Sequence, residues 1–469
     1  MTKPVRKGDI VDLRIEKLVY GGKGLARYND YVVFVKNCVP GQKIKAKIYR
    51  AKSSYGEAHP IRILEHSAVE IEPACPYFEH CGGCNHQDIA YDDQLKFKQK
   101  QVRDLYSRMG GFDNIKFESI ADADRQFRYR NKMEFAFSAH RWLMHDFEAE
   151  KPHDFALGLR APGYYWKAVD IDDCLIAPEE TEQVLDIVRT YALKNDLQPY
   201  SVRDHTGYLR HLVLRKSAQT DQLMIIIVTN QDTPEKIEAL SAELASKIPN
   251  LSSFINSYTT NVGGTTLPEK THLLYGKDHI IDKIDEHEFI ISPNSFFQTN
   301  TGMAAKLYTI IKEKAELNGD EIIWDLYSGT GSISIYLADQ ARQIIGFEIV
   351  PEAVQDAHKN AKRNNVDNLK FIEGNLDNIF RKQAEILEKL PHPDAMIIDP
   401  PRAGMHPKLV QNVIEIAPRK IVYVSCKPST QVRDVNKLVD AKYAINSVKP
   451  VDMFPQTSHI EVVTRLTKK

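Results

Sequence analysis

The sequence has no long hydrophobic run and no apolar leader at its N-terminus. Its longest uninterrupted aliphatic stretch, Leu223–Val228, has six residues, whereas a helix needs about 20 apolar residues to span a bilayer. We therefore predict no membrane-spanning helix. The residues that follow Met1 are charged and polar, which excludes the apolar core of a secretory signal peptide. We expect a cytoplasmic protein without a membrane partner.

Cysteine is scarce, with six residues among 469. In a reducing compartment thiols stay free, so ligands or catalytic groups are expected rather than disulfides. Cys75, Cys81 and Cys84 form the pattern C-x5-C-x2-C, and Cys174 could supply a fourth thiolate. Such a set suits either tetrahedral zinc or a [4Fe-4S] cluster, and the spacing alone does not separate the two. Cys38 is expected to be an ordinary packed thiol.

The chain also lacks an excess of charge of either sign, since 62 Lys and Arg face 63 Asp and Glu. A neutral balance usually counts against a nucleic-acid partner, but here the average hides a segregation. Residues 1–66 contain 14 basic and six acidic residues, a net charge of +8, and the other 403 residues carry a net charge of −9. An RNA partner is therefore still expected.

The basic segment alternates apolar and polar residues in short bursts separated by glycine turns, for example at 31–35 and 44–49. This period of two with frequent turns predicts a small antiparallel β-barrel of the OB-like type. Such barrels bind single-stranded RNA through a charged face and aromatic side chains. We expect an RNA-binding arm that is separable from the cofactor domain. The alternative is a solvated basic β-domain with another role.

Beyond residue 66 the pattern changes twice. Residues 67–290 hold the cysteine cluster, a polar helix over about 91–110 that can pack on the C-terminal domain, and then mostly strands. This order predicts a central, mostly antiparallel α+β domain. From 291 to 469 strands alternate with helices, which predicts a parallel, doubly wound, Rossmann-like sheet. The expected fold class is therefore multidomain α/β, with domains at 1–66, 67–290 and 291–469.

A glycine-rich turn follows the first strand of the C-terminal domain. Glu321–Leu326 predicts a buried strand, and Tyr327–Ser332 contains two glycines just before a helix, where the backbone can approach a ligand closely. Glu348 ends the next strand, 19 residues after the first of these glycines, where an acidic side chain meets a ribose. Ser334 replaces the third glycine of the dinucleotide motif, so S-adenosylmethionine is favoured over NAD.

Later strands of this domain end in reactive or acidic side chains. Asp399–Arg402 (DPPR) follows the fourth strand and lacks both the aromatic of amine methylases and the cysteine of cytosine-C5 methylases. Cys426 ends the fifth strand beside Lys427, where cations would favour its thiolate. His459 and Glu461 open the last strand and can reach the same crevice. Taken singly, each of these residues also suits a structural role.

Together these motifs resemble the RNA (uracil-5-)-methyltransferase family. The resemblance rests on four motifs in order along the chain, which are Asn294–Asn300 (NSFFQTN), Asp399–Arg402 (DPPR), Ser425–Asp434 (SCKPSTQVRD) and Thr457–Glu461 (TSHIE). Residues 1–66 resemble the TRAM domain of that family, so the similarity covers nearly the whole chain. The sequence departs from many relatives at Lys427, where asparagine is commoner.

The resemblance implies a reaction and roles for its residues. Cys426 would add to C6 of uracil, C5 would then attack the methyl group of S-adenosylmethionine, and Glu461 would remove the C5 proton. His459 is implied as a neighbouring partner. The residues implied to contact S-adenosylmethionine or the adjacent base are Gln298, Tyr327, Glu348, Asn375 and Asp399. Of these, Asp399 could instead bind the edge of the uracil.

The resemblance also favours a [4Fe-4S] cluster over zinc on Cys75, Cys81, Cys84 and Cys174. Its role would be structural or RNA-positioning, because uracil methylation by this route needs no electron. A TRAM-like segment together with a cluster resembles the 23S rRNA uracil-C5 methyltransferases more than the bacterial tRNA branch. The expected substrate is therefore large-subunit ribosomal RNA in a single-stranded or remodelled loop, and the expected enzyme is a monomer.

Alternatives remain at this point. The chain could be a uracil-54-type tRNA methyltransferase, or a noncatalytic RNA-binding iron-sulfur protein. A redox enzyme would need a second substrate site, of which the sequence gives no sign. Arg125–Lys132 interleaves basic and aromatic residues and is a candidate RNA track, with an ordinary amphipathic strand as its alternative.

Overall fold

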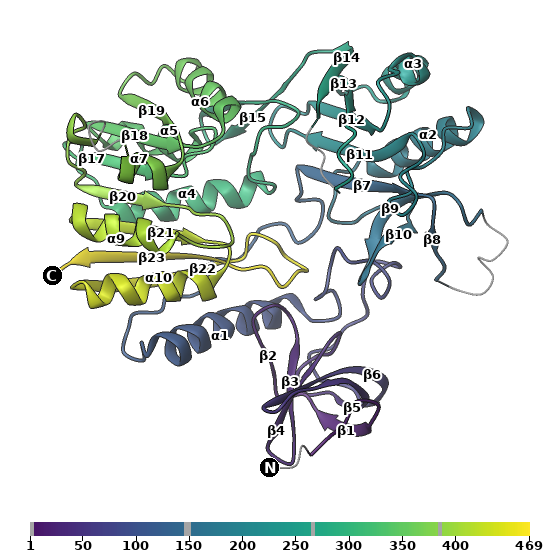
Figure 1. The fold of residues 1–469 in the computed structure, drawn as a ribbon, viewed down its shortest axis with the longest axis horizontal. Coiled ribbons are helices and arrows are strands. Elements are labelled where there is room, and N and C mark those ends of the chain that lie inside the picture. The colour runs from purple at the N-terminus through teal and green to yellow at the C-terminus, as the bar shows by residue number, and fades with distance from the viewer. Residues whose placement is uncertain (1–3, 145–151, 264–267, 383–386) are drawn as a thin grey trace.

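The computed structural model describes residues 4–144, 152–263, 268–382 and 387–469. Three regions follow one another along the chain (Figure 1): a small barrel, a central region around one large sheet, and a C-terminal region with a second large sheet. Within the described residues, no helix combines the length and the hydropathy needed to cross a membrane.

The N-terminal region is a six-stranded sheet in the order β1-β5-β6-β4-β3-β2. Its strands pair antiparallel except for β4 with β6, and β1 also lies against β3, so the sheet curls on itself into a barrel. In β5 the buried Ile44, Ala46 and Ile48 alternate with three outward lysines, as expected of a strand with one face in a core. The strands are β1 (Ile10–Arg14), β2 (Lys17–Leu18), β3 (Gly24–Tyr28), β4 (Tyr31–Val35), β5 (Lys43–Ala51) and β6 (Tyr55–Glu65).

The central region is an eight-stranded sheet in the order β14-β13-β12-β11-β7-β9-β10-β8, antiparallel except at the β12–β13 and β8–β10 pairs. Helices α2 and α3 cover one face, toward which Phe135 and Phe137 of β7 point. Glu134 and Ala136 alternate with these two residues along β7 and so face the other way. The elements are β7 (Lys132–Ser138), β8 (Arg141–Trp142), β9 (Ala156–Ala161), β10 (Tyr164–Asp170), α2 (Thr181–Lys194), β11 (Leu209–Lys216), β12 (Leu223–Thr229), α3 (Glu235–Lys247), β13 (Leu251–Tyr258) and β14 (Lys270–Gly276).

The C-terminal region is a seven-stranded sheet in the order β19-β18-β17-β20-β21-β23-β22, with five parallel strands followed by two antiparallel ones. Helices α4 to α6 cover one face and α7, α9 and α10 the other. This is the predicted doubly wound sheet, and its central strands β17, β20 and β21 are mostly apolar and buried, as suits a sheet that is covered on both faces. Its strands are β17 (Ile322–Leu326), β18 (Gln343–Glu348), β19 (Leu369–Glu373), β20 (Ala395–Ile398), β21 (Lys420–Ser425), β22 (Tyr443–Val451) and β23 (Glu461–Lys468).

The helices of this region and a small hairpin complete it. The helices are α4 (Thr301–Ala315), α5 (Ser332–Leu337), η2 (Ala338–Gln340), α6 (Pro351–Arg363), α7 (Leu376–Lys382), α9 (Pro407–Ile416) and α10 (Pro428–Asp440). The hairpin pairs β15 (Ile280–Ile284) with β16 (His287–Ile291) and precedes α4.

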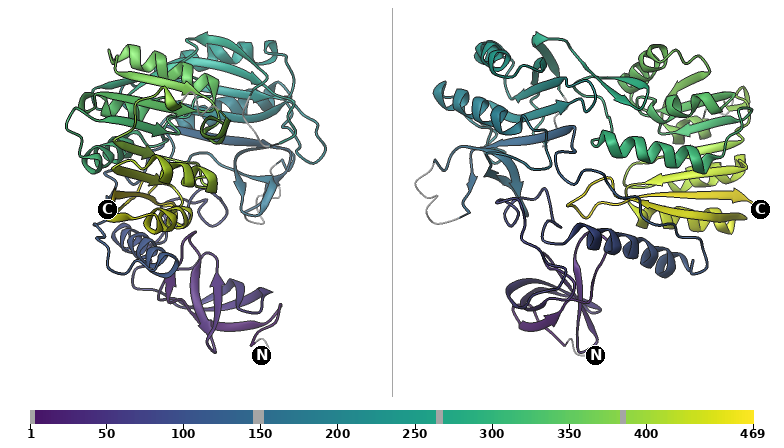
Figure 2. Two further views of the ribbon diagram at one scale, coloured as in Figure 1. Left: turned by 60° about the vertical axis from the view of Figure 1, so that its left-hand side comes forward. Right: turned by 180° about the vertical axis from the view of Figure 1, so that it is seen from behind.

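Helix α1 (Tyr91–Gly110) lies along the C-terminal region beside α10 (Figure 2, right). It contains a fully buried lysine: Lys98 Nζ lies 2.5 Å from Asp452 Oδ1, and neither side chain is exposed. The hydroxyl of Tyr91 donates to the other oxygen of Asp452 at 3.0 Å. Because removing one partner of a buried ion pair leaves an uncompensated charge, these contacts fix α1 against the segment that leads into β23.

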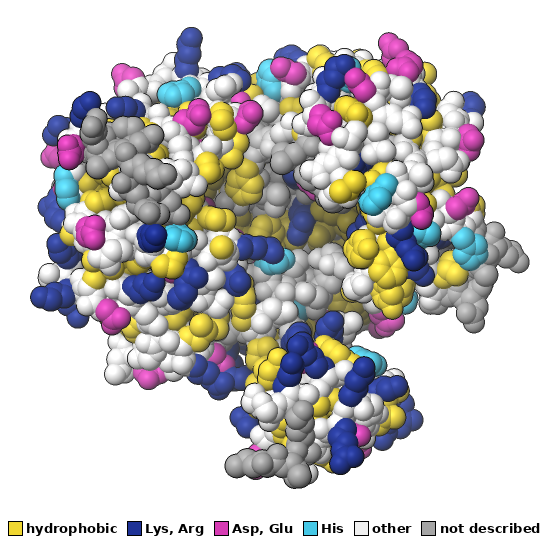
Figure 3. Space-filling model, viewed as in Figure 1, with side chains coloured by type: hydrophobic (Ala, Val, Ile, Leu, Met, Phe, Trp, Pro, Cys, Tyr) yellow, Lys and Arg dark blue, Asp and Glu magenta, His cyan; other side chains and the backbone are white. Residues whose placement is uncertain are grey.

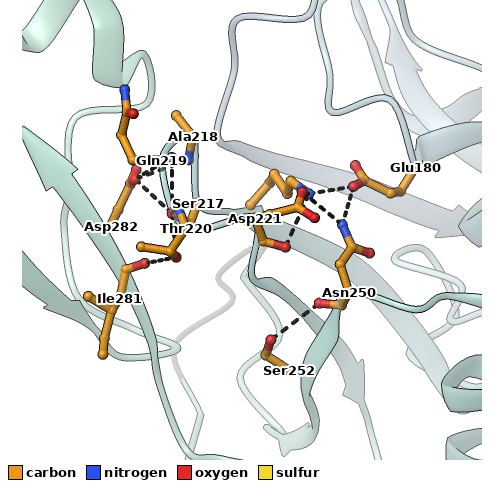
Figure 4. A network of polar contacts seen from close by, with 11 residues as sticks. Glu180, Ser217, Ala218, Gln219, Thr220, Asp221, Asn250, Ser252, Ile281 and Asp282 are labelled. Atoms are coloured by element: carbon orange, nitrogen blue, oxygen red, sulfur yellow. Dashed lines mark hydrogen bonds and ion pairs between the residues drawn. The ribbon is translucent and has the colours of Figure 1, made fainter.

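Asp282 joins the central and C-terminal regions (Figure 4). One of its oxygens accepts from the hydroxyl of Ser217 at 2.8 Å and from the N–H groups of Ala218 and Gln219. The other oxygen accepts from the hydroxyl of Thr301, the first residue of α4, at 2.8 Å. Asp282 is fully buried, so these hydrogen bonds compensate its charge and hold the central sheet against the start of α4.

Candidate active site

The turn after β17 has an unusual backbone. Tyr327, Gly329 and Gly331 all lie in the left-handed region, with φ of 69°, 54° and 77°. A Cβ at Gly331 would lie 2.8 Å from the ring of Phe371, so this position requires glycine for space as well as for conformation. The turn therefore presents bare backbone at the carboxyl edge of the sheet, directly before α5.

Ser334 stands at the position of the third glycine of the dinucleotide motif, and its side chain has a structural role there. Its hydroxyl donates to Asp325 at 2.6 Å and so ties α5 to β17. Burial raises the pKa of Asp325 to about 7, and the carboxylates of Asp399 and Glu348 add to this shift. Three acidic side chains therefore lie near one another at this edge of the sheet.

Glu348 holds the glycine turn to the end of the next strand. One oxygen of its carboxylate accepts from the N–H of Gly329 at 3.0 Å. The other accepts from the N–H groups of Ile349 and Val350 at 2.8 and 2.9 Å, and both of those side chains are exposed. A carboxylate has about four acceptor positions, so Glu348 can also accept from a ligand hydroxyl beside an apolar surface.

The other residues predicted to contact the cofactor lie around this edge. The N–H of Gly374 donates to the carbonyl of Glu348 at 2.8 Å, which places Asn375 beside the Glu348 strand end. Gln298 lies in the loop before α4. The hydroxyl of Thr330, in the glycine turn, donates to the backbone carbonyl of Phe296 in the same loop. Asp399 directly follows β20, and burial raises its pKa to about 6.

The predicted nucleophile and base lie at facing strand ends. Strands β21 and β23 are antiparallel, with Ser425 opposite Val462. The next positions outward are Cys426 and Glu461, so the register brings these two residues together. Glu461 is buried, with 8% of its surface exposed. The arrangement places a thiol and a carboxyl group at the same edge of the sheet as the glycine turn.

Burial and like charges favour the neutral forms of both groups. The pKa of Cys426 is raised to about 11 by burial and then by the carboxylates of Glu461 and Asp399. The pKa of Glu461 is raised well above its ordinary value by burial and by Asp399. His459 also stays neutral, because burial and nearby cations lower its pKa to about 4. The site therefore needs a cation to ionise the thiol.

Arg402 is that cation, and sequence reasoning missed its role. Its charge lowers the pKa of Cys426, of Glu461 and of His459. In the sequence, Arg402 is notable only because it stands where amine methylases have an aromatic. Its place three residues after Asp399, at the carboxyl edge of the sheet, is the signal that could have identified it.

The segment before β23 is held in place from outside the C-terminal region. The carbonyl of Gln456 accepts from the N–H groups of Asn85 and His86 at 3.0 and 3.1 Å. Its side-chain oxygen accepts from Gln94 of α1 at 2.9 Å. The ring of His459 packs on Phe454, with the ring centroids 5.9 Å apart. Helix α1 and the loop of residues 75–86, which carries Cys75, Cys81 and Cys84 and is called the cysteine loop from here on, therefore determine where His459 and Glu461 lie.

Tyr20 is a second residue that sequence reasoning missed. It lies in the turn between β2 and β3 of the barrel, and its ring packs on the cluster of Val102, Val432 and Ile460. Its hydroxyl donates to the backbone carbonyl of Cys426 at 3.3 Å. The barrel therefore touches the loop of Cys426 directly. No local pattern could reveal a contact between residues 406 positions apart.

Cys75, Cys81, Cys84 and Cys174 line one pocket, as the sequence predicts for a shared ligand set. Burial raises the pKa of Cys81 to about 12, and the other three thiols add to the shift. Among the described residues, however, no three His, Cys, Asp or Glu side chains are grouped so that they could hold a metal ion. The structure thus brings the four thiols to one place without showing a metal site.

The candidate RNA track at Arg125–Lys132 is largely used inside the protein. Arg128 pairs with Asp173, and the hydroxyl of Tyr129 donates to Pro455 at 2.9 Å. Arg130 stacks over the ring of Phe454, 5.5 Å from its centroid. These contacts favour a structural role for this segment, connecting the cysteine pocket to the segment before β23.

Two protein-family models match this chain, one in its N-terminal part and one in its C-terminal half. Residues 237–469 match the tRNA (Uracil-5-)-methyltransferase family, and residues 4–61 match the TRAM domain. An uncharacterized RNA methyltransferase of Chlorobaculum tepidum is 38% identical over 465 residues, which cover 98% of this chain and 96% of the relative. The chain belongs to the RNA (uracil-5-)-methyltransferase family. The predicted family and the TRAM domain are thereby confirmed.

Other members are similar over the same length. An uncharacterized RNA methyltransferase of Bacteroides thetaiotaomicron is 38% identical over 452 residues, 95% of this chain and 98% of the relative. Among solved structures, the Pyrococcus abyssi tRNA (uracil-54, C5)-methyltransferase in complex with S-adenosyl-L-homocysteine has a TM-score of 0.75 at 27% identity. The similarity covers 97% of this chain and 99% of that structure. The C-terminal region is therefore an S-adenosylmethionine-dependent methyltransferase fold.

The contact of Tyr20 predicts that the barrel contributes to turnover in this member of the RNA (uracil-5-)-methyltransferase family. Tyr20→Phe keeps the packed ring but removes the hydrogen bond to the nucleophile loop. A neutral hydrogen bond contributes roughly 1 kcal/mol, so we expect kcat to fall about five-fold. KM for RNA and the affinity for S-adenosylmethionine should stay within two-fold.

Steady-state methylation kinetics with a uridine-containing RNA measure this effect. The matched control is Tyr28→Phe in the same barrel, because the hydroxyl of Tyr28 makes no hydrogen bond within the described structure. A raised KM with unchanged kcat would mean that Tyr20 only contributes to RNA binding and would contradict the positioning role.

Proposed function

We propose that this protein methylates C5 of uracil in RNA through a covalent adduct between Cys426 and C6 of the base. One observation carries the proposal: Cys426 and Glu461 lie at facing ends of β21 and β23, on the edge of the sheet that also carries the glycine turn. The family match is consistent with this chemistry. A noncatalytic protein would have no need to keep a thiol, a buried carboxyl group and a cation together.

Cys426, Glu461 and Arg402 have different roles in the proposed reaction. The thiolate of Cys426 adds to C6, which gives C5 enolate character. C5 then attacks the electrophilic methyl group that bound S-adenosylmethionine supplies. The carboxylate of Glu461 removes the C5 proton, and the thiolate leaves C6, so that the free enzyme is restored. Arg402 lowers the pKa of both Cys426 and Glu461 and so favours the ionised forms that these steps need.

The cofactor proposal rests on the carboxyl edge of the sheet. Glu348 would accept from the ribose hydroxyls, with the exposed Ile349 beside it against the adenine. Gln298 would contact the amino-acid end, and Tyr327 and Asn375 would flank the cofactor from the ends of β17 and β19. Asp399 lies near enough to raise the pKa of Cys426 and Glu461, which favours contact with the uracil edge over contact with the cofactor.

We also propose that Cys75, Cys81, Cys84 and Cys174 hold a [4Fe-4S] cluster. All four thiols line one pocket, which is partly open to solvent. Burial and mutual proximity raise the pKa of the thiols, and a cationic cluster core would relieve this repulsion. A structural role fits, because Arg130 near these thiols also stacks on Phe454 before β23.

The proposed substrate is large-subunit ribosomal RNA, on the combination of a TRAM domain with the cysteine set. The Pyrococcus abyssi structure, named as a tRNA (uracil-54, C5)-methyltransferase, keeps transfer RNA as the second candidate. Both substrates share the chemistry at Cys426 and differ only in how the target uridine is presented.

The adduct predicts trapping by 5-fluorouracil. Ribosomal RNA containing 5-fluorouracil is incubated with the enzyme and S-adenosylmethionine, then separated under denaturing conditions. Fluorine cannot leave C5 as a proton does, so the wild-type enzyme should form a stable covalent complex with the RNA. Cys426→Ala should form none, whereas the matched control Cys38→Ala should form as much as wild type. With ordinary RNA, Glu461→Gln should slow turnover by about 10²–10⁴-fold.

Persistence of the covalent complex in Cys426→Ala would overturn the assignment of the nucleophile. Absence of the complex in wild type that binds RNA would overturn the mechanism.

The cluster proposal predicts iron and sulfide in the anaerobically purified protein. We expect broad visible absorption and about four iron and four sulfide ions per chain. Cys81→Ser should lose them, whereas Cys38→Ser in the barrel should keep them. A colourless protein with stoichiometric zinc, or with neither metal, would show the proposal to be wrong.

A further inference from the structure

A second large cavity lies outside the methylation site, between the cysteine loop and the central sheet. Its volume is about 620 Å³, within the range of ligand-binding pockets. The floor comes from β7, β9 and β11, the rim from the cysteine loop and from loops of the central region. Its lining includes Glu134, Arg160, Tyr165 and His211.

The cavity lies on the face of the central sheet that turns toward the C-terminal region. Glu134 and His211 point away from the core that α2 and α3 cover. Farther along the same face of β11, Val213 packs in the core shared with the C-terminal region, and Arg215 donates to the carbonyl of Ser295 at 2.8 Å. Figure 3 shows the molecule hollowed between these two regions, with Lys and Arg side chains along the hollow.

Arg160 is a partly buried cation without a counter-charge. Burial is the one cause that shifts the pKa of Arg160, and it lowers it. The guanidinium of Arg160 has no hydrogen bond or ion pair within the described residues. Glu134 is the only carboxylate among the described residues that line the cavity, and it is paired with Lys132 at 2.6 Å. An unpaired guanidinium in a cavity is costly unless it binds an anion, and its planar fork matches a phosphate.

His211 supplies a neutral donor beside this cation. Its pKa is lowered to about 4 by burial and then by the charge of Arg160, so the imidazole is uncharged at neutral pH. Its ring nitrogens have no hydrogen-bond partner in the part of the chain that the structure describes. A neutral imidazole can donate to and accept from a sugar or a base.

The rim of the cavity is aromatic and exposed. Tyr165 is 69% exposed, and its ring lies 5.2 Å from that of Trp166. Tyr164 lies 5.1 Å from Trp142 and 5.3 Å from Trp166, so two of the three tryptophans of the chain are in this cluster. Arg203 stacks over Trp166 at 5.6 Å. Exposed aromatics beside cations are the platform on which unpaired bases stack.

We propose that this cavity and its aromatic rim bind a single-stranded RNA segment next to the target uridine. Arg160 binds a phosphodiester, His211 contacts the adjoining sugar or base, and a nucleobase stacks on Tyr165. The proposal rests on the proposed function, since it places part of the same RNA substrate. A phosphate site and a stacking site side by side fit a nucleic-acid strand better than an isolated anion or an apolar peptide.

The test measures RNA affinity without S-adenosylmethionine, so that binding is separated from methylation. The probe is a fluorescein-labelled, uridine-containing single-stranded RNA of 20 nucleotides, with a duplex of the same length as competitor. Arg160→Gln and Tyr165→Ala should each raise Kd about ten-fold, by the loss of one phosphate contact and one stacked base. Arg160→Gln should also reduce the salt slope of log K by about 0.7. The duplex should compete poorly.

Three controls keep the result specific. Arg160→Lys retains the charge and should recover most of the affinity. Arg342→Gln removes an exposed arginine at the opposite edge of the C-terminal sheet and should leave Kd unchanged. The kcat for methylation at saturating RNA should stay within two-fold of wild type in every variant.

Unchanged Kd in both Arg160→Gln and Tyr165→Ala would overturn the proposal, as would equal competition by the duplex. If the variants lose affinity while the wild-type enzyme makes no 5-methyluridine, the proposed function fails and the RNA site stands.

Discussion

The active site depends on the buried pair between Lys98 of α1 and Asp452. Neither side chain is exposed, so neither charge is compensated by water, and each depends on the other. Asp452 begins the segment that ends at Glu461, and Gln94 on the same helix bonds Gln456 within it. A helix from the first quarter of the chain thereby fixes where the proposed base stands relative to Cys426.

The same constraint explains why three regions meet at one site. The backbone N–H groups of Asn85 and His86 in the cysteine loop donate to the carbonyl of Gln456, and Tyr20 of the barrel contacts the loop of Cys426. The geometry of the site therefore depends on how the barrel and the cysteine loop pack against the C-terminal region. Burial of the site raises the pKa of Cys426 and of Glu461 and so favours their neutral forms. The charge of Arg402 lowers both pKa values and so favours the ionised forms.

Much of this arrangement could be predicted from the sequence, because it follows from local patterns. The apolar strand before Cys426 and the alternating order of strands and helices place that thiol at the carboxyl edge of a parallel sheet. Spacing alone related Glu348 to the glycine turn, and the structure shows the hydrogen bond between Glu348 and Gly329. The basic barrel followed from its period of two and its glycine turns.

The rest depends on contacts between distant segments. Lys98 belongs to a polar helix and gives no local sign that it is buried against Asp452, 354 residues away. The barrel was expected to be a separable arm, but Tyr20 packs on Val432 and Ile460 and contacts the loop of Cys426. Arg402 lies in a recognised motif, yet its effect on three neighbouring groups arises only when β20, β21 and β23 meet.

The most direct test of the central claim is the identity of the methylated nucleoside. Ribosomal RNA and transfer RNA are incubated separately with the enzyme and S-adenosylmethionine carrying a deuterated methyl group, digested to nucleosides and analysed by mass spectrometry. We predict labelled 5-methyluridine from ribosomal RNA and none with Cys426→Ala. Label in any other nucleoside, or none from either RNA with the wild-type enzyme, would contradict uracil-C5 methylation, and 5-methyluridine from transfer RNA alone would contradict the ribosomal substrate.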